Sequence, residues 1–471
     1  MSVPRLSRRL RLRPGGLGAG SLGVVGCLHW TLGTGVLLGV KSARPQFAVD
    51  WLPMQIVQPL HTLGALGFLF YGIIALMSVV MRRHGMRTAG ALGWVSTGMG
   101  VFLLAAGGSV LLGWGSGLEY TSWWMPLTVV PAFVAAALAG CVWIDLRRFV
   151  NLSAEGSWLL LMGTLLILLG IVERGAGTMA REVTRALMVE WHALDTMFAG
   201  INVSLYGLAI LITSAPGGGR PMRPRLLCGV AVFALLSTFG HHHYLSSQPL
   251  TFKWLAFGAS MLGLLSLWRH VSSLRRGHHA AATTAATVFF RVATAWTVFA
   301  VGTGVLLAVP PINEVLHGTH AIVAHSMGSI IGINVMIVIG GLASDLPANR
   351  YAVQLPVLQR RARWFSAILL ALVVVLAASG VVKGVLRIEH GHQSYQHIVR
   401  GLLVPLPAIG LILSLVVIRL MTRIRRCLSG DPPVAPTNES PDRCQSPGMF
   451  CASAPCEAQD SMRSELMEVQ R

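Results

Sequence analysis

The 471-residue sequence is poor in charge, and above all in acidic side chains. Charged residues make up only 12% of the chain, whereas hydrophobic residues make up 54%. Asp and Glu together number 18, against 37 Lys and Arg. This composition excludes an ordinary soluble globular protein and indicates an integral membrane protein.

Cysteine motifs are also missing, because the seven cysteines form no CxxC or CxxCH. The chain therefore encodes neither a redox dithiol nor covalent attachment of a c-type heme. No small-residue cleavage site follows the basic N-terminus, so we expect the first apolar run to stay in the protein as a membrane anchor. No convincing internal repeat is evident.

Apolar runs of about 20 residues predict an all-α membrane protein with twelve transmembrane helices. The helical domain is expected over residues 20–427, after a basic N-terminus at 1–19 and before a Pro- and Ser-rich, disordered tail at 428–471. The twelve helices are expected to start near Gly20, Ile56, Gly90, Met125, Ser157, His192, Arg225, Pro249, Thr287, Thr319, Trp364 and Gly401.

The basic residues lie before the first helix and in every second loop, as in "RRHGMR" after the second helix and "RHVSSLRRGHH" after the eighth. By the positive-inside rule, all these segments share the cytoplasmic side, and so do both termini. The formal net charge of +19 thus reflects membrane topology. Nucleic acid is not an expected partner.

Five histidines fall at one depth of the predicted bundle. His61 lies in helix two, His192 opens helix six, His241 and His242 end helix seven, and His325 lies in helix ten. With the predicted topology, all of them are in the outer half of the bilayer. Ionisable side chains at this depth are costly and usually functional. Their convergence from four helices predicts a shared site.

Three of these histidines can bind a transition metal. His192, His241 and His242 supply three neutral imidazoles from two helices, which leaves an open coordination position on the metal. An open position allows catalysis or ligand exchange.

Helix ten can serve two different metal centres. His325 and Met327 project about 200° apart on an α-helix, and both residue types are competent heme ligands. His325 is expected to hold one heme facing the three-histidine metal, while Met327 and His61 hold a second heme. A methionine in an apolar helix more often only packs, and that alternative stays open for Met327.

The segments "GHHHYLSSQP" and "HGTHAIVAHSMG" resemble motifs of the catalytic subunit of the heme-copper oxidase superfamily. The branch with the greatest similarity is that of the bacterial nitric oxide reductases and the cbb-type oxidases. The resemblance implies a twelve-helix fold with two b-type hemes and one non-heme metal, iron or copper. It implies that His192, His241 and His242 ligate the non-heme metal, that His325 ligates the high-spin heme, and that His61 ligates the low-spin heme.

The resemblance further implies reduction of nitric oxide to nitrous oxide in the bacterial cytoplasmic membrane. The electrons must come from an external donor, which can be a cytochrome c subunit, a cupredoxin or quinol. The other expected partners are membrane lipid and the gaseous substrate.

The sequence departs from the family at the second ligand position of helix ten. The family has a histidine there, and this chain has Met327. The low-spin heme therefore has His/Met ligation, recruits another residue such as His320, or is missing.

A second departure concerns the carboxylate that nitric oxide reductases carry four residues after the helix-six histidine. Thr196 stands at that position, with Asp195 directly before it, and helix eight has no acidic residue. The two positions for the catalytic tyrosine of the oxidases hold Thr196 and Leu235. A proton-pumping oxidase is therefore not expected.

Three alternatives to nitric oxide reduction remain open. The first two are nitric oxide dismutation and oxygen reduction by an enzyme of the same fold. The third is a heme protein without catalytic activity that transfers electrons or senses a gas. A metal transporter is disfavoured, because it needs a polar path through the inner half of the membrane, and helices six and seven are nearly apolar below their histidines.

Overall fold

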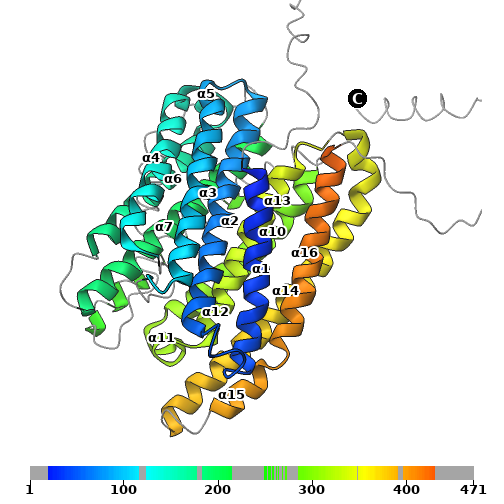
Figure 1. Cartoon of the computed structure of the whole chain (residues 1–471). Coiled ribbons are helices and arrows are strands. Elements are labelled where there is room, and N and C mark those ends of the chain that lie inside the picture. Colours follow the sequence, from blue (N-terminus) through cyan, green and yellow to red (C-terminus); the bar gives the residue numbers. More distant parts are fainter. Residues whose placement is uncertain are drawn as a thin grey trace, which may run out of the picture. The chain divides into compact units, whose positions relative to one another are not determined.

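The computed structural model describes residues 20–115, 123–177, 183–214, 285–346, 348–390 and 396–429, with parts of 249–272. The chain divides into two units, Met1–Asp431 and Pro432–Arg471, and only the first contains described residues. Their regular structure is helical throughout (Figure 1), which confirms the predicted all-α class. The predicted N-terminus at 1–19 and nearly all of the predicted tail lie outside the described residues.

The helices are named as in Figure 1, and the intervals between them include short 3-10 and π-helical segments. Their bounds are α1 Ser21–Ala43, α2 Met54–Arg83, η1 Arg87–Gly90, α3 Ala91–Leu111, η2 Met125–Thr128, α4 Val129–Ile144, α5 Leu146–Leu152, α6 Ala154–Gly177, α7 Val183–Thr213, α10 Ala285–Ala308, α11 Pro310–Leu316, α12 His320–Met327, η3 Gly328–Val335, α13 Met336–Ala343, α14 Ala348–His390, α15 Gln396–Leu403 and α16 Leu406–Ser429.

Ten spans in the described part of the chain are long and apolar enough to cross a membrane. They match ten of the twelve predicted helices. Of the other two, the helix near Arg225 lies outside the described residues and the helix near Pro249 is described only in part. The count of twelve therefore stays a prediction.

Two predicted helix starts are clearly wrong. The helix expected near His192 begins at Val183, so His192 lies inside α7 rather than at its start. The helix expected near Trp364 begins at Ala348, so the basic segment "ANRYAVQLPVLQRRAR" is helical rather than a loop. Leu, Gln, Arg and Ala are strong helix formers, and the helix continues from this polar segment into the apolar one.

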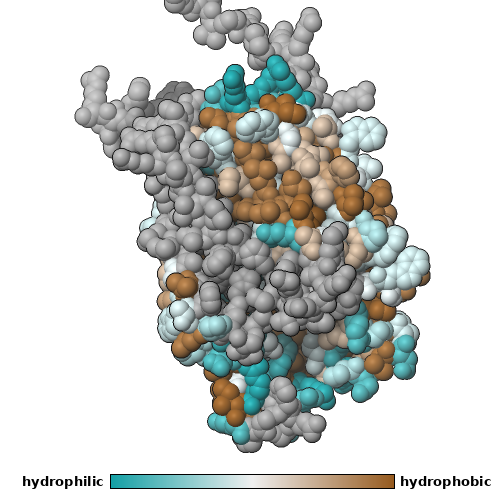
Figure 2. Space-filling view, turned by 90° about the vertical axis from the view of Figure 1, so that its left-hand side faces the viewer, coloured by the Kyte–Doolittle hydropathy of each residue, from teal (hydrophilic) through white to brown (hydrophobic). Residues whose placement is uncertain are grey.

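The ends of the helices divide into two groups, with α5 at one end of the bundle and α11 and α15 at the other (Figure 1). Near α5, Arg83 at the end of α2 forms an ion pair with Asp345 at 2.7 Å. Figure 2 shows apolar side chains gathered below a polar cap on one side of the bundle, with polar residues returning at the lower end. This distribution is the one that a bilayer requires.

Helices α6 and α7 pack at backbone contact through glycines spaced seven residues apart. A Cβ on Gly163 would lie 2.6 Å from the carbonyl oxygen of Gly200, and a Cβ on Gly200 would lie 2.7 Å from that of Gly163. Gly156 and Gly207 form a second such pair, at 2.9 and 2.7 Å. Small residues allow this close approach of membrane helices. The contact fixes α7, which carries His192 and Asp195, against α6.

The predicted helix ten consists of α12, the π-helix η3 and α13 in succession. It begins at His320, where the Thr319 hydroxyl accepts a hydrogen bond from the Ala321 amide at 3.2 Å, close to the predicted start. Inside η3, the buried Asn334 amide donates to the Asn202 side-chain oxygen of α7 at 2.7 Å. This bond ties helix ten to α7.

Candidate functional site

A cavity of about 810 Å³ lies between α1, α2, α7, α10, α12, η3, α14 and α16. Its size falls within the range of cofactor and ligand pockets, about 300–1,000 Å³. Most of the lining is apolar. The predicted site residues His61, Asp195, His325 and Met327 all line it, so the structure brings together side chains from α2, α7 and α12.

His61 is held against α1 by its Nδ1 atom. This nitrogen lies 3.0 Å from the Thr31 carbonyl oxygen and 3.4 Å from the Thr34 hydroxyl. A carbonyl oxygen only accepts hydrogen bonds, so Nδ1 carries the proton and Nε2 is the nitrogen with the lone pair. The neutral tautomer suited to metal ligation is therefore the one that the structure stabilises.

His325 is held in the same way against α10. Its Nδ1 lies 3.0 Å from the Thr303 hydroxyl oxygen. That hydroxyl donates its single proton to the carbonyls of Phe299 and Ala300, both at 3.1 Å. With its proton on a carbonyl, the Thr303 oxygen accepts from Nδ1–H, and this arrangement leaves Nε2 as the unprotonated nitrogen.

A glycine completes each support. A Cβ on Gly35 would lie 3.0 Å from Cε1 of His61, and a Cβ on Gly304 would lie 3.1 Å from Cε1 of His325. Both glycines directly follow the supporting threonine. The Cε1 edge of each imidazole thus faces a helix at a place where only a residue without a Cβ fits without displacement.

The two supports share one hexapeptide, which the sequence analysis missed. "GTGVLL" occurs at residues 33–38 in α1 and again at residues 302–307 in α10. In both copies the threonine bonds back to a carbonyl three or four residues earlier and also contacts the ring of a histidine on another helix. This short repeat is the signal that could have identified Thr34 and Thr303 from sequence.

The carboxylate and threonine predicted near the metal occupy different environments. Asp195 lines the cavity, whereas Thr196 is fully buried and is not part of the described lining. Of these two residues, Asp195 is therefore the one placed to act on a bound group.

The mouth of the cavity near α11 is rich in basic side chains. His317, His320 and Lys383 line it. Lys383 donates to the Gly318 carbonyl at 3.1 Å, and Arg387 donates to the His317 carbonyl at 3.2 Å. Burial, and then the nearby charges of Arg387 and Lys253, lower the pKa of His317. A basic mouth of this kind is complementary to carboxylates.

Deeper in the cavity, the lining is more polar than the sequence analysis expected. Asn202 and Tyr206 line it, and the buried Tyr206 hydroxyl lies 2.6 Å from the Thr297 hydroxyl of α10. Asp195, Asn202 and Tyr206 are spaced by seven and four residues, which places them on one face of α7. This spacing is the sequence signal for the polar face.

The three-histidine metal site lies beyond what the structure describes. His192 belongs to the backbone of α7, but its side chain is outside the described set, and His241 and His242 are outside it entirely. Among the residues that were described, no group of three or more His, Cys, Asp or Glu is placed to hold a metal. The assignment of these three histidines therefore stays a prediction.

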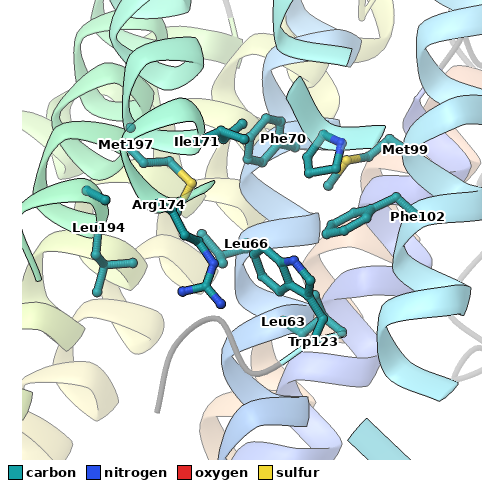
Figure 3. Close-up of a pocket in the computed structure, with 13 residues that line it drawn as sticks. Leu63, Leu66, Phe70, Met99, Phe102, Trp123, Ile171, Arg174, Leu194 and Met197 are labelled. Atoms are coloured by element: carbon teal, nitrogen blue, oxygen red, sulfur yellow. The ribbon is translucent and has the colours of Figure 1, made fainter. Parts of the chain in front are cut away.

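A second, much smaller pocket lies on the other side of Leu194, which lines both spaces (Figure 3). Its volume of about 20 Å³ gives room for a water-sized molecule. Its lining is almost wholly apolar, apart from the buried Arg174, whose guanidinium lies 4.8 Å from the centre of the Trp123 ring. This pocket cannot hold a heme.

The sequence matches no protein-family profile and no curated protein. A comparison with solved structures finds a heme-copper terminal oxidase, determined as a dimer by cryo-EM. The two chains share 11% identity and a TM-score of 0.62, over 88% of this chain and 85% of the other. The likeness does not bear on the nitric oxide reductase branch. This chain is an all-helical integral membrane protein with the fold of a heme-copper terminal oxidase.

Proposed function

We propose that the chain is a membrane redox enzyme that reduces nitric oxide to nitrous oxide at a site formed by a high-spin heme and a non-heme metal. The observation that carries this proposal is the paired support of His61 and His325 on one cavity, each held through Nδ1 so that Nε2 would be the nitrogen that ligates a metal. The shared fold with a heme-copper terminal oxidase supports it.

The chemistry of the described residues supports a proposal of two b-type hemes. His325 would hold the high-spin heme, and His61 with Met327 would hold the low-spin heme, with His320 as the other candidate ligand. Gly35 and Gly304 give room for the imidazoles, and the basic mouth around His317 and Lys383 suits the heme carboxylates. When bound, heme iron supplies electron transfer and binding of small gaseous molecules.

The remaining parts of the proposed site are the non-heme metal and the proton supply. His192, His241 and His242 would ligate iron or copper. Asp195 lines the cavity and can hold or deliver a proton there. The overall reaction consumes two nitric oxide molecules, two electrons and two protons and gives one nitrous oxide and one water. The electrons would come from a cytochrome c subunit, a cupredoxin or quinol.

Oxygen reduction is the second candidate, because the matched structure is that of a terminal oxidase. Tyr206 also lines the cavity and forms a hydrogen bond to Thr297. Its position, however, is neither of those at which oxidases carry their catalytic tyrosine. Nitric oxide reduction therefore remains the leading proposal.

Optical spectra and gas consumption of the purified protein test both candidates. We expect two b-type hemes, one of which binds carbon monoxide, and consumption of nitric oxide faster than oxygen with a reduced donor. His325→Ala should remove the carbon monoxide signal, and His61→Ala should remove the low-spin signal. A preparation without heme would refute the proposal, and faster oxygen consumption would favour the second candidate.

A further inference from the structure

A pocket of about 500 Å³ opens on the outward surface of α14, near the end of the bundle where the basic residues gather. Its lining includes Arg360, Arg363, Trp364 and Ala367, which are spaced by three, one and three residues and so share one face of the helix. We propose that this pocket binds the phosphate headgroup of an anionic membrane lipid.

The charge of the pocket is uncompensated within the described structure. No carboxylate there lies within ion-pair distance of Arg360 or Arg363. The neighbouring Arg361 is committed to a carbonyl of α16, that of Arg419, at 2.7 Å. Two guanidinium groups left on one open pocket are suited to a phosphate, which they bind through paired hydrogen bonds.

The depth of the pocket favours a lipid over a soluble anion. Arg360 and Arg363 lie where α14 changes from a basic to an apolar segment, directly before the apolar run that begins at Trp364. Trp364 is 61% exposed beside them, and tryptophan concentrates at the level of the lipid headgroups. A basic pocket at this level is typical of sites for anionic headgroups.

The surface below the pocket suits an acyl chain. Ala367, Leu370 and Val374 continue the same face of α14 toward the membrane centre, and all three are exposed. Headgroup and tail contacts thus lie on one continuous strip. This inference depends on the membrane location of the chain and not on the proposed redox function, so a heme-free preparation would leave it testable.

The test is a titration of the delipidated full-length protein with phosphatidylglycerol and, separately, with phosphatidylcholine, with bound lipid counted by native mass spectrometry. The double variant Arg360→Gln/Arg363→Gln should bind phosphatidylglycerol about tenfold or more weakly than the wild type. The control Arg425→Gln/Arg426→Gln removes two charges from exposed sites at the end of α16 and should bind as the wild type does. Trp364→Ala keeps both charges and should weaken binding by a smaller factor, about threefold.

Three results would overturn the proposal. The first is unchanged phosphatidylglycerol binding by the folded Arg360→Gln/Arg363→Gln or Trp364→Ala variant. The second is displacement of the lipid by inorganic phosphate at equal concentration, which would make the pocket a site for a soluble anion. The third is a tenfold gain in lipid binding after removal of residues 430–471 that is lost again in the double arginine variant. Residues 430–471 carry seven acidic and three basic side chains, and this result would make them the native occupant of the pocket.

Discussion

At the scale of single residues, the described contacts that support His61 and His325 come from uncharged groups. The Thr31 carbonyl and the Thr34 hydroxyl contact Nδ1 of the first ring, and the Thr303 hydroxyl contacts Nδ1 of the second. Uncharged acceptors orient a histidine without introducing a second buried charge, which would be costly at this depth in a membrane. The glycine beside each ring is then needed for space rather than for backbone freedom.

Gly304→Ala tests that need for space. The new Cβ would meet Cε1 of His325 at 3.1 Å, so the ring must move, and we expect a shifted high-spin heme spectrum and a loss of stability of about 1–3 kcal/mol. The matched control is Gly302→Ala in the same hexapeptide, where a Cβ meets nothing within 4 Å. For the low-spin heme, Gly35→Ala is the corresponding variant and Gly33→Ala is its control. Equal heme spectra for a variant and its control would contradict the need for space beside the ring.

Thr303→Val tests the hydrogen bond while keeping the shape of the side chain. His325 would lose its acceptor at 3.0 Å, and loss of such an outer partner typically lowers the affinity of a metal site about 10- to 100-fold. We expect faster heme loss from the high-spin site, with the low-spin spectrum unchanged. The rate of heme loss is measured by transfer of the released heme to apomyoglobin. Thr303→Ser keeps the hydroxyl and should behave as the wild type; a heme-loss rate shared by both variants would argue for packing alone.

The sequence allowed part of this site to be predicted. Depth in the bilayer was sufficient to predict that His61, His325 and Met327 share one space, because the helix ends could be inferred from the basic loops. The partners of their rings could not be predicted, since Thr34 and Thr303 lie on other helices and nothing in local spacing shows which helices are neighbours. The repeated "GTGVLL" was visible, but its meaning depends on that neighbourhood.

At the scale of elements, the glycines between α6 and α7 determine how closely the site-bearing helix can be held. The long apolar run of α6 predicted a membrane helix, but the seven-residue glycine spacing was needed to identify its partner. The contact is made by backbone atoms, which cannot rotate away as side chains can. A single added methyl group therefore separates the helices.

Gly163→Ala should consequently destabilise the protein by more than about 3 kcal/mol, beyond the usual range for overpacking. A Cβ there would lie 2.6 Å from the Gly200 carbonyl oxygen. Gly175→Ala on the same helix is the control, since a Cβ at Gly175 meets nothing within 4 Å. Thermal unfolding in detergent measures both variants, and equal midpoints would show that the two helices can separate at little cost.

At the scale of the whole membrane unit, polar contacts join the helix ends on the basic side. Asp145, at the end of α4, accepts from the Thr88 amide at 2.9 Å and from the Thr88 hydroxyl at 2.7 Å. Burial alone would raise the pKa of Asp145, but the bonds from Thr88 and Arg87 and the charge of Arg148 outweigh it, so the pKa lies below its ordinary value. The carboxylate therefore stabilises the folded state.

The sign of this effect predicts acid sensitivity. A group with a lowered pKa contributes stability above its unfolded pKa, about 3.9 for Asp, and loses it as the pH falls through the lower folded value. Asp145→Asn should destabilise the protein by about 1–3 kcal/mol at pH 7, and the difference from the wild type should shrink below about pH 4. Unfolding midpoints of Asp145→Asn and the wild type at pH 7, 5 and 3 measure this dependence. A difference between the two proteins that stays constant with pH would assign the effect of the substitution to packing.

Much of the fold at this scale could be predicted, because membrane spans are long and apolar and need no knowledge of partners. The exceptions were the starts of α7 and α14. The first sixteen residues of α14 include four arginines and were assigned to a loop. Apolar content marks where a helix enters the bilayer, not where the helix itself begins. Helix propensity, rather than hydropathy, carries the missing information there.

The π-helix η3 affects how positions in helix ten can be transferred between proteins. Each turn of a π-helix holds an extra residue, so residues beyond Gly328–Val335 are rotated by roughly 100° relative to an uninterrupted α-helix. Counting from His325 to assign an equivalent residue in α13 therefore points to the wrong face of the helix. An alignment of this chain with a protein whose helix is α-helical throughout at this place needs a one-residue gap inside that segment, placed by three-dimensional superposition.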